Sequence, residues 1–368
     1  MAKAMKVEVE VGALVAAVAE TTAVASRKST MPILSYLRLS ARDGRLEAVG
    51  TDLDLTVAAS LPARVEGDGR VCVPARAFHE VLRSLTGEKV KLEVGTNERL
   101  TIRCGGAEFR LVGLNDQDFP SVQVEEKDLT FRAVPADALA RLLRRAAAAA
   151  STDPSRPNLT NVVLERDQNE VVGVATDGHR MVVAREAGEW VPKKWMLPLA
   201  AVAAVRRLVE GVEGDVKVAE TGNSVVVKAG DKVLVARQGE GGFPDWRQVL
   251  PKDRKGGLTV KSAALLETTK RVGLVAAKRV LTLKLGGKAL GIEGTDPERG
   301  EAKEEVEAMY DGAEAKLGID GRYLADAVEG AGSDEVAVTF GEQVGMEAIE
   351  VRPVSAGGYL AVIMPVRI

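Results

Sequence analysis

The sequence predicts an α+β protein built from three related repeats, because segments recur at a fixed period and strand-like runs alternate between apolar and polar residues. FPSV at 119–122 returns as FPDW at 243–246, a shift of 124 residues. VPARAFHEVL from Val73 returns as LPLAAVAAVR from Leu197, again a shift of 124. A Thr-Asp dipeptide also recurs, at 51–52, 176–177 and 295–296. Self-similarity at a fixed period indicates repeated structural units, and three periods of about 124 residues account for the chain.

Each repeat is expected to contain two helices with two or three strands between them and further strands after the second helix. The first helices are predicted at Val11–Ser26, Ala136–Ser151 and Lys261–Ala277, and the second at Ala75–Leu85, Leu199–Val209 and Gly321–Gly330. Runs such as EVVGVATDGHRMVVA have a period of two, which is typical of half-buried antiparallel strands rather than of a parallel sheet. Charged, turn-like stretches separate the repeats, giving predicted domains of residues 1–125, 126–253 and 254–368.

The composition excludes several classes of protein. With 46% hydrophobic and 28% charged residues, the chain is typical of a globular protein. Its 50 basic and 53 acidic residues give a net charge of −3, so nucleic-acid binding would need basic residues gathered on one surface. Cys72 and Cys104 stand apart in apolar runs, which predicts no disulfide or cysteine metal site and a reducing cytoplasm. No run of 18 apolar residues exists, and Glu8 and Glu10 interrupt the basic start that a signal peptide would need.

Basic residues recur on the predicted outward faces of the helices. In the second helix of the first repeat, Arg76 and Arg83 lie seven residues apart, opposite the apolar stripe. In the first helix of the second repeat, Arg141, Arg144 and Arg145 lie opposite the leucines. A single solvated helix often carries such residues, but their recurrence predicts a positive surface that follows a phosphate backbone without reading bases. Further basic positions are Lys28, Arg206, Arg207, Lys270, Arg271, Lys278, Arg279 and Arg322.

The segment TDGHR at 176–180 groups an aspartate, a histidine and an arginine around a glycine. In a hydrolase, His179 could act as a general base that Asp177 orients. Asp-Gly is also a favoured hairpin dipeptide, so the segment could instead be a tight turn between two strands. The sequence has no P-loop, GxSxG, HExxH or paired metal-ligand motif, so we expect no enzyme activity, cofactor or metal site.

Eight short motifs occur in a fixed order along the chain. They are MPIL (31–34), GTDLDL (50–55), VPARAF (73–78), RPNLTN (156–161), ATDGHRM (175–181), FPDWRQVLP (243–251), DPERGEAKEE (296–305) and MPVRI (364–368). In this order and spacing, within a threefold repeat, the sequence resembles the bacterial DNA sliding clamp, the beta subunit of the replicative DNA polymerase III.

The resemblance implies a DNA-clamp fold of three repeated domains, with antiparallel sheets outside and helices lining a ring formed by a head-to-tail dimer. Such a homodimer would encircle duplex DNA without sequence preference and act as a processivity factor in the cytoplasm. It would hold its partners near the template by effective concentration. Those partners would be the replicative polymerase catalytic subunit, the clamp loader, and other polymerases and repair proteins that carry a clamp-binding peptide. No catalytic residue, cofactor, metal or membrane contact is implied.

The resemblance also implies three groups of site residues. The DNA-facing group is Lys28, Arg76, Arg141, Arg145, Lys278 and Arg279. A pocket between the second and third domains would accept a short linear peptide with apolar anchors. Its residues would be Leu159, Thr176, Gly178, His179, Arg180, Met181, Pro244, Val249, Val362, Met364, Pro365, Val366 and Arg367. The dimer interface would use Phe109 of one subunit and Leu274, Glu301, Glu304 and Glu305 of the other. Arg76 fits both the DNA surface and the dimer interface.

Two other functions remain compatible with the sequence. A monomeric peptide-binding adaptor would use the same pocket without encircling DNA. A hydrolase would use His179 and Asp177 and would lose turnover when His179 is replaced. The oligomeric state and the bonding of TDGHR separate these alternatives from a clamp.

Overall fold

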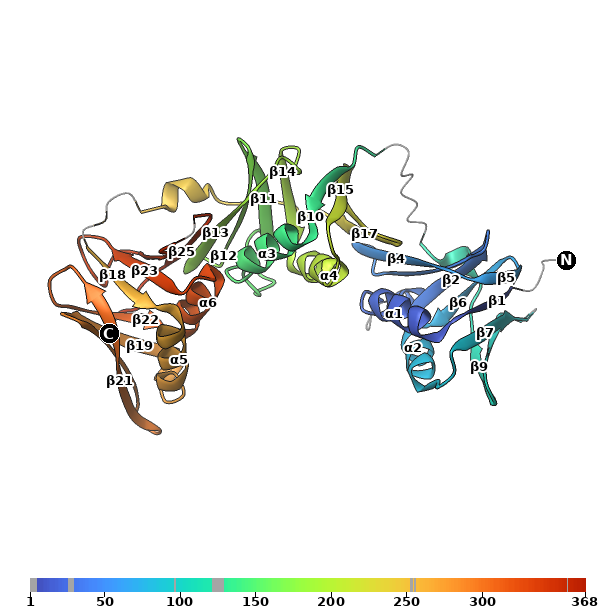
Figure 1. Cartoon of the computed structure of the whole chain (residues 1–368), viewed down its shortest axis with the longest axis horizontal. Helices are drawn as coiled ribbons and strands as arrows, with labels where there is room; N and C mark the ends of the chain where they lie inside the picture. The colour runs from blue at the N-terminus through green and yellow to red at the C-terminus, as the bar shows by residue number, and fades with distance from the viewer. Residues whose placement is uncertain are drawn as a thin grey trace. The chain divides into compact units, whose positions relative to one another are not determined.

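The computed structural model of the chain describes residues 5–25, 30–95, 97–120, 129–251, 254, 256–355 and 357–368. The chain divides into two compact units, whose elements are labelled in Figure 1. The first unit is Met1–Asp137 with Ala203–Gln238, and the second is Ala138–Val202 with Gly239–Ile368. Each unit therefore contains one terminal repeat and part of the middle repeat.

The order of elements recurs three times along the chain. The first repeat contains β1 (Lys6–Glu10), α1 (Val11–Thr22), η1 (Pro32–Ser35), β2 (Tyr36–Arg42), β3 (Arg45–Thr51), β4 (Leu55–Pro62), β5 (Arg64–Gly67), β6 (Gly69–Pro74), α2 (Ala75–Ser84), β7 (Lys89–Val94), β8 (Arg99–Cys104), β9 (Ala107–Val112) and η2 (Asp116–Asp118). The second contains β10 (Arg132–Pro135), α3 (Ala136–Ala147), β11 (Asn161–Asp167), β12 (Glu170–Thr176), β13 (Arg180–Ala187), β14 (Lys194–Pro198), α4 (Leu199–Val209), β15 (Asp215–Thr221), β16 (Ser224–Ala229) and β17 (Lys232–Arg237).

After η4 (Trp246–Val249), the third repeat follows the same order. It contains β18 (Gly256–Lys261), α5 (Ser262–Val272), η5 (Ala277–Arg279), β19 (Val280–Gly286), β20 (Ala289–Asp296), β21 (Gly300–Tyr310), β22 (Ala315–Asp320), α6 (Gly321–Ala331), β23 (Glu335–Phe340), β24 (Ile349–Pro353) and β25 (Tyr359–Ile363). The predicted α+β fold of three repeats is confirmed. The prediction of two or three strands between the helices was too low, because each repeat also has a strand that leads into its second helix: β6, β14 and β22.

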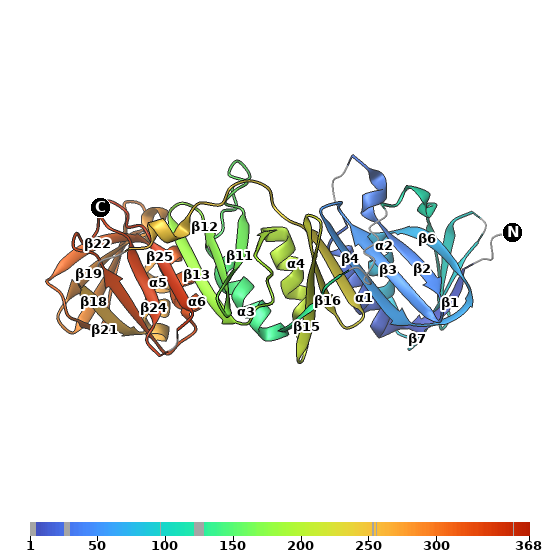
Figure 2. The ribbon, with the colours of Figure 1, turned by 90° about the horizontal axis from the view of Figure 1, so that it is seen from above.

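The strands form antiparallel sheets in both units. In the first unit, a five-stranded sheet has the order β5-β1-β7-β8-β9, and an eight-stranded sheet has the order β10-β15-β16-β17-β4-β3-β2-β6. In the second unit, twelve strands are connected in the order β14-β11-β12-β13-β25-β24-β23-β18-β21-β20-β19-β22. Figure 2 shows β13, β25 and β24 following one another in this sheet. Strands of neighbouring repeats therefore pair directly, β4 with β17 and β13 with β25.

Five of the six predicted helices begin at the predicted residue, and α5 begins at Ser262 instead of Lys261. The first helix of each repeat ends earlier than predicted. Helix α3 stops at Ala147 although alanines continue, because the N–H of Ser151 is bonded to the Leu159 carbonyl oxygen at 2.9 Å. Helices α1 and α5 stop at Thr22 and Val272, where tighter i→i−3 bonds replace the helical pattern. The high helix propensity of alanine favours longer helices. Competing main-chain hydrogen bonds nevertheless determine where these three helices end.

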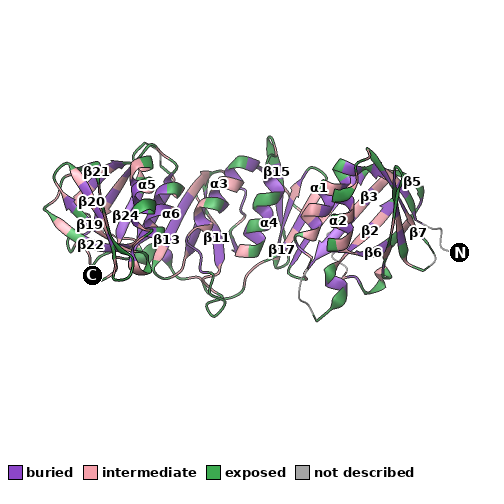
Figure 3. Cartoon of the chain, turned by 90° about the horizontal axis from the view of Figure 1, so that it is seen from below, coloured by how far each residue is buried: buried purple, intermediate pink, exposed green. Residues whose placement is uncertain are grey.

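The core of each terminal repeat lies between its sheets and its pair of helices. Helices α1 and α2 pack side by side, as do α5 and α6 (Figure 1). Phe78 and Leu82 of α2 are fully buried, whereas Arg76 and Arg83 on the opposite face are exposed, as the helical spacing predicts. Figure 3 shows exposed stripes on the helices and buried residues on the strands behind them. No helix in the described ranges is long and apolar enough to cross a membrane.

Both cysteines are buried in strands of the first repeat. Cys72 in β6 is fully covered and Cys104 in β8 is 7% exposed. Burial, with a smaller contribution from Asp116, raises the pKa of the Cys72 thiol to about 12. Because the thiolate is the reactive species, Cys72 is inert in the folded protein at neutral pH.

We therefore expect a Cys104→Ser variant, which keeps only Cys72, to resist a chromogenic disulfide reagent at pH 8 until the protein is unfolded in urea. The absorbance released with and without urea measures this directly. Rapid reaction of Cys72 in the native protein would contradict the assigned burial.

Candidate functional site

The TDGHR segment is a hydrogen-bonded turn that connects β12 to β13. The Thr176 hydroxyl donates to the Arg180 carbonyl oxygen at 2.7 Å and accepts the Gly178 N–H at 3.1 Å. The Asp177 Oδ1 accepts the N–H groups of His179 and Arg180 at 2.9 and 3.0 Å. Gly178 has φ +91°, a left-handed conformation that favours glycine. The turn interpretation of TDGHR is confirmed, and the Asp177 carboxylate is used by main-chain groups rather than by a histidine side chain.

The first repeat contains the same turn with different side chains. The Thr51 hydroxyl donates to the Leu55 carbonyl oxygen at 3.1 Å, and Asp52 accepts the N–H groups of Asp54 and Leu55 at 3.1 and 2.7 Å. Leu53 occupies the place of Gly178, with φ +85° and a side chain that is 53% exposed. In the third repeat, Asp296 accepts N–H bonds from the two residues Glu298 and Arg299. The backbone of the turn is thus shared, while its surface chemistry differs between repeats.

Arg180 connects this turn to α6. Its Nε donates to Asp177 Oδ2 at 3.0 Å, its Nη1 donates to Asp326 Oδ2 at 2.6 Å, and its guanidinium lies 4.3 Å from the centre of the Tyr323 ring. The side chain is only 9% exposed. Removing one partner of such a buried ion pair typically costs about 3–5 kcal/mol. Burial together with the Asp177 charge raises the pKa of Tyr323. Arg180 therefore holds the turn and the helix in one fixed geometry.

Tyr323 and Asp326 were not identified by the sequence analysis. Both lie in α6, whose start is fixed by Asp320, which accepts the N–H groups of Arg322 and Tyr323. The helix ends at Ala331, and its C-cap residue Gly332 has the left-handed conformation. The stretch IDGRYL contains these start signals, but no local pattern indicates that its side chains face a turn more than 140 residues away.

The C-terminal segment lies directly beside the TDGHR turn. Strand β25 pairs with β13 so that Ile363 is opposite Arg180. The Met364 N–H then donates to the His179 carbonyl oxygen, and the Val366 N–H donates to the Gly318 carbonyl oxygen, both at 2.9 Å. The side chain of Met364 is 45% exposed. The terminal MPVRI segment is thus fixed at two points and presents apolar side chains to solvent.

Two further segments surround the turn. The segment 243–251 packs through Trp246 against a cluster that includes Met181 and Val362, while Pro244 and Val249 stay exposed. On the other side, Arg156 Nη1 donates to the Asp177 carbonyl oxygen at 3.4 Å, and the Leu159 N–H donates to the Arg156 carbonyl oxygen at 2.9 Å. Arg156 is a further contact residue that the sequence did not indicate. Hydrogen bonds, strand pairing and packing therefore bring together residues from these predicted pocket segments: Leu159, Thr176, Gly178, His179, Arg180, Met181, Val362, Met364 and Val366.

The predicted DNA-facing residues differ in how free their charges are. Arg141 is half-buried and forms a two-pronged bond with Glu186 at 2.6 and 2.8 Å. Arg145 donates to the Ala331 carbonyl oxygen at 3.2 Å and lies 5.6 Å from the Tyr359 ring centre, and burial lowers its pKa. These two arginines act at least partly as internal anchors. Residues exposed on these elements are Arg76, Arg144, Lys278 and Arg279, whereas Lys28 lies outside the described residues.

The predicted interface residues lie on two strands and one loop. Phe109 is on β9, an edge strand of its sheet, and the Leu274 side chain just after α5 is 74% exposed. Glu301, Glu304 and Glu305 lie on β21. Bonds from the Arg271 guanidinium and the Thr268 hydroxyl lower the pKa of Glu304 to about 2, so this carboxylate is ionised at neutral pH.

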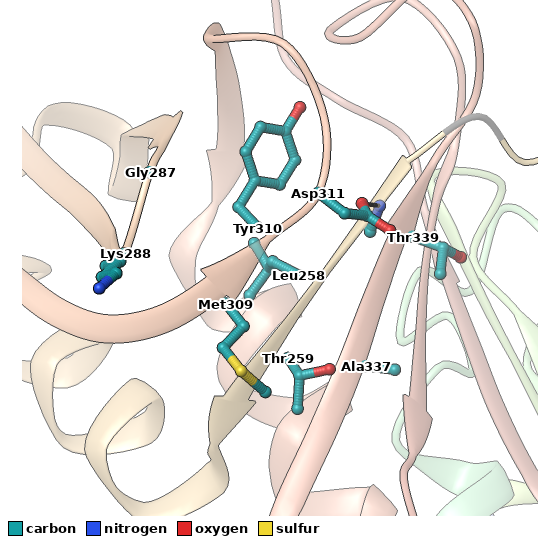
Figure 4. A pocket seen from close by; sticks show the side chains of 10 residues that line it. Leu258, Thr259, Gly287, Lys288, Met309, Tyr310, Asp311, Ala337 and Thr339 are labelled. Atoms are coloured by element: carbon teal, nitrogen blue, oxygen red, sulfur yellow. Dashed lines mark hydrogen bonds between the residues drawn. The ribbon is translucent and has the colours of Figure 1, made fainter.

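A separate hollow of about 480 Å³ lies on the third repeat (Figure 4). Met309 and Tyr310 of β21, Lys288 and Asp311 contribute to its lining. The Asp311 carboxylate accepts the Gly257 N–H at 2.7 Å. None of the residues predicted to bind a peptide lines this hollow. Among the residues in the described ranges, no cluster of three or more histidine, cysteine or acidic side chains could hold a metal ion.

Comparisons with known proteins agree with this architecture. The models of the N-terminal, central and C-terminal domains of the DNA polymerase III beta subunit match residues 5–123, 133–245 and 247–367. The beta sliding clamp of Caulobacter vibrioides is 31% identical, with 99% of this chain and 100% of that protein covered. Crystal structures of the Bacillus subtilis clamp and of a Bartonella birtlesii clamp bound to griselimycin each have a TM-score of 0.93 at 26% identity. The first comparison covers 99% of both chains, and the second covers 99% of this chain and 100% of that one.

The fold and the repeated turns define a three-domain clamp of the kind found in DNA replication. The chain belongs to the bacterial beta sliding clamp family, the beta subunits of DNA polymerase III.

A Gly318→Ala variant is expected to displace the terminal segment. A methyl group at 318 would run into the Val366 carbonyl oxygen and the Ile368 side chain. Because backbone cannot move aside without weakening the Val366 N–H bond, we expect a loss of about 1–3 kcal/mol in stability and faster hydrogen exchange at the Met364 and Val366 amides. Gly12→Ala is the control, since its methyl group meets nothing within 4 Å. Unchanged exchange in Gly318→Ala would contradict the described packing.

Proposed function

We propose that the chain is a replication processivity factor: a homodimeric ring that encircles duplex DNA, slides along it and tethers the replicative polymerase through a peptide site. One observation carries this proposal. The strand that follows each of the first two Thr-Asp turns pairs with the last strand of the next repeat. By contrast, β21, the strand after the third turn, pairs over Gly300–Glu307 with β20 alone among the described strands.

The pairing rule is visible in two places. Strand β4 follows the first turn and pairs with β17, the last strand of the second repeat. Strand β13 follows the second turn and pairs with β25, the last strand of the third repeat. By the same rule, β21, which follows the third turn, would pair with β9, the last strand of the first repeat. Among the described strands, β9 is a sheet edge, and β21 pairs over Gly300–Glu307 with β20 alone.

Exposed strand edges are places where another chain can pair. Joining β21 of one subunit to β9 of a second subunit would form a junction equivalent to the two internal ones. The second subunit's own β21 and the first subunit's β9 would still be free to pair. Such a head-to-tail contact gives a closed ring when the rotation closes. Family membership supports closure by two subunits.

The internal junctions also give the register of the proposed pair. Thr51 is opposite Thr56 in its hairpin, and Thr295 is opposite Glu301 in the third repeat, so Glu301 corresponds to Thr56. Thr56 pairs with Val235. The last strands β17 and β9 each follow a hairpin turn, after β16 and β8 respectively. Counting the same number of residues from each turn makes Val235 of β17 equivalent to Arg110 of β9.

The register therefore places Glu301 opposite Arg110 of the partner, and Lys303 opposite Glu108. Both pairs have opposite charge, which favours cross-strand pairing. The same register places Phe109 opposite Ala302, a small residue that leaves space for the ring. Leu274, Glu304 and Glu305 would flank this contact.

DNA contact is proposed for the helical faces. Exposed Arg76, Arg144, Lys278 and Arg279 would meet phosphates without reading bases, with Lys28 adding to this surface. The anchored side chains of Arg141 and Arg145 would contribute charge at fixed positions. Since the net charge is −3, retention on DNA would come from encirclement rather than from high affinity.

The peptide site is proposed at the TDGHR turn and the segments around it. The residues are those inferred from the sequence, with Pro365 and Arg367 in the terminal segment and Tyr323, Asp326 and Arg156 added as supports. Partners would be the polymerase, the clamp loader and other replication or repair proteins that carry a suitable peptide. The griselimycin complex of the Bartonella birtlesii clamp suggests a ligand that can probe this chain.

The first repeat offers the same backbone but a different surface, which supports one peptide site per subunit. Leu53 projects from the position of Gly178, and Asp54 replaces His179. The Arg237 N–H donates to the Asp54 carbonyl oxygen at 2.7 Å, as Met364 does to His179. A charged pair thus replaces the exposed methionine.

The proposal includes no catalytic step, cofactor or metal, places the protein in the cytoplasm, and retains the domain boundaries 1–125, 126–253 and 254–368. The bonds of Asp177 to main-chain groups leave the hydrolase alternative without structural support.

The interface is tested by reversing one charge pair. Arg110→Glu and Glu301→Arg would each place like charges across the junction, which we expect to weaken the dimer at least about tenfold. The double variant restores opposite charges and should recover dimerisation. Sedimentation equilibrium measures the dissociation constant.

Arg64→Glu is the matched control, because β5 is the other edge of the same sheet as β9. It should dimerise normally. Single variants that dimerise as tightly as the unmodified chain, or a double variant without recovery, would contradict the register. A monomeric unmodified chain would favour the adaptor alternative.

A further inference from the structure

We propose that Glu165 is a positioning residue: it lies outside the peptide site and supports the geometry of that site. It would set ligand affinity by fixing the segment 243–251. This inference rests on the proposed peptide-binding function. The bonds that support it join β11 to η4 within the second unit.

The segment that presents Pro244 and Val249 has little regular structure of its own. It contains only η4, the four residues Trp246–Val249. Its local bonds come from Asp245, which accepts the Arg247 N–H at 3.2 Å and the Gln248 side-chain amide at 2.8 Å. Such a short 3₁₀ turn has weak internal bonding. Its position therefore depends on contacts to the rest of the unit.

Glu165 provides the main polar contact. Its Oε1 accepts the indole N–H of Trp246 at 3.1 Å and the Nη1 of Arg247 at 2.7 Å. The side chain of Glu165 is 16% exposed and Trp246 is 4% exposed, so water screens the bond between them weakly. The Arg247 side chain is 49% exposed, so its bond to Glu165 is screened more. One carboxylate oxygen thus holds two consecutive residues of η4.

The two donors also hold each other. The Arg247 guanidinium lies 4.3 Å from the centre of the Trp246 ring, and its Nη2 is 3.5 Å from Asp167 Oδ2. Glu165 and Asp167 are two residues apart on β11 and therefore face the same side of the sheet. The cluster fixes both the direction of the indole ring and the path of the following chain.

The indole ring of Trp246 links this cluster to the predicted peptide-binding residues. Trp246 is 4% exposed and packs in the cluster that contains Met181 and Val362, both predicted pocket residues. Val249 follows three residues later, and its side chain is 60% exposed. Loss of the Glu165 carboxylate would leave a buried indole N–H without its acceptor and would release Arg247. The apolar surface around Val249 would then occupy several positions, and a ligand would have to order it on binding.

The test compares Glu165→Ala, Glu165→Gln and Arg247→Ala with the unmodified chain. Fluorescently labelled griselimycin is the probe, and its dissociation constant and off-rate are measured. We expect Glu165→Ala and Arg247→Ala to weaken binding about tenfold, chiefly through a faster off-rate. Glu165→Gln keeps an acceptor for the indole N–H. We therefore expect its loss in log Kd to be about half that of Glu165→Ala. The Glu165→Ala/Arg247→Ala double variant should lose less than the sum of the single losses, since both act through one contact.

Glu189→Ala is the matched control. Glu189 pairs with Arg166 in the same unit and is 48% exposed, whereas Glu165 is 16% exposed. No salt bridge joins Glu189 to 243–251 among the described residues. It should bind as the unmodified chain does. Hydrogen exchange across 243–251 is measured in parallel, and it should increase in Glu165→Ala but not in Glu189→Ala.

The outcomes separate the inference from the proposed function. If the unmodified chain binds griselimycin and Glu165→Ala and Arg247→Ala bind equally well, the positioning role is overturned while the peptide site stands. If the unmodified chain does not bind, the peptide site and the role of Glu165 in binding both fall. An equal loss in Glu189→Ala would also overturn the inference, because the effect would then be a general loss of surface ion pairs.

Discussion

The constraint on which the rest of the structure depends is main-chain pairing between repeats. The strand after each Thr-Asp turn needs a partner, and the last strand of the next repeat provides it, as β17 does for β4 and β25 for β13. Among the described strands, β9 is a sheet edge, and β21 pairs over Gly300–Glu307 with β20 alone. Unpaired edges invite association, and opposite charges at the proposed register would favour a second copy of the same chain as the partner.

The same pairing explains where a peptide site can form. At each internal junction, the turn, the strand that follows it and the end of the next repeat meet in the same backbone geometry. Side chains then decide the chemistry of the junction. At one junction Gly178 has no side chain and Met364 is 45% exposed, whereas Leu53 and Arg237 stand at the same positions of the other junction. The supports around the open junction, Arg180 and the Glu165 cluster, stabilise its geometry through charged and partly buried bonds.

The sequence was sufficient for the fold class and for the start of every helix to within one residue, because periodicity and start signals are local properties. It failed for the ends of α1, α3 and α5, where bonds such as that from Ser151 to Leu159 overrode alanine propensity. It identified the TDGHR turn but missed Tyr323, Asp326 and Glu165, since contacts between distant segments leave no local pattern. It also could not tell that Arg141 and Arg145 are bound by Glu186 and Ala331, because helix angles give direction and not partners.

The most direct test of the central claim is disulfide formation across the inferred junction. Phe109→Cys and Ala302→Cys in one chain would place two thiols at directly opposed cross-strand positions, close enough to bridge. Mild oxidation followed by denaturing electrophoresis without reductant should give a covalent species of two chains. The native cysteines are buried and should not react. A product that stays monomeric would contradict the register, and a ladder of longer oligomers would contradict closure by two subunits.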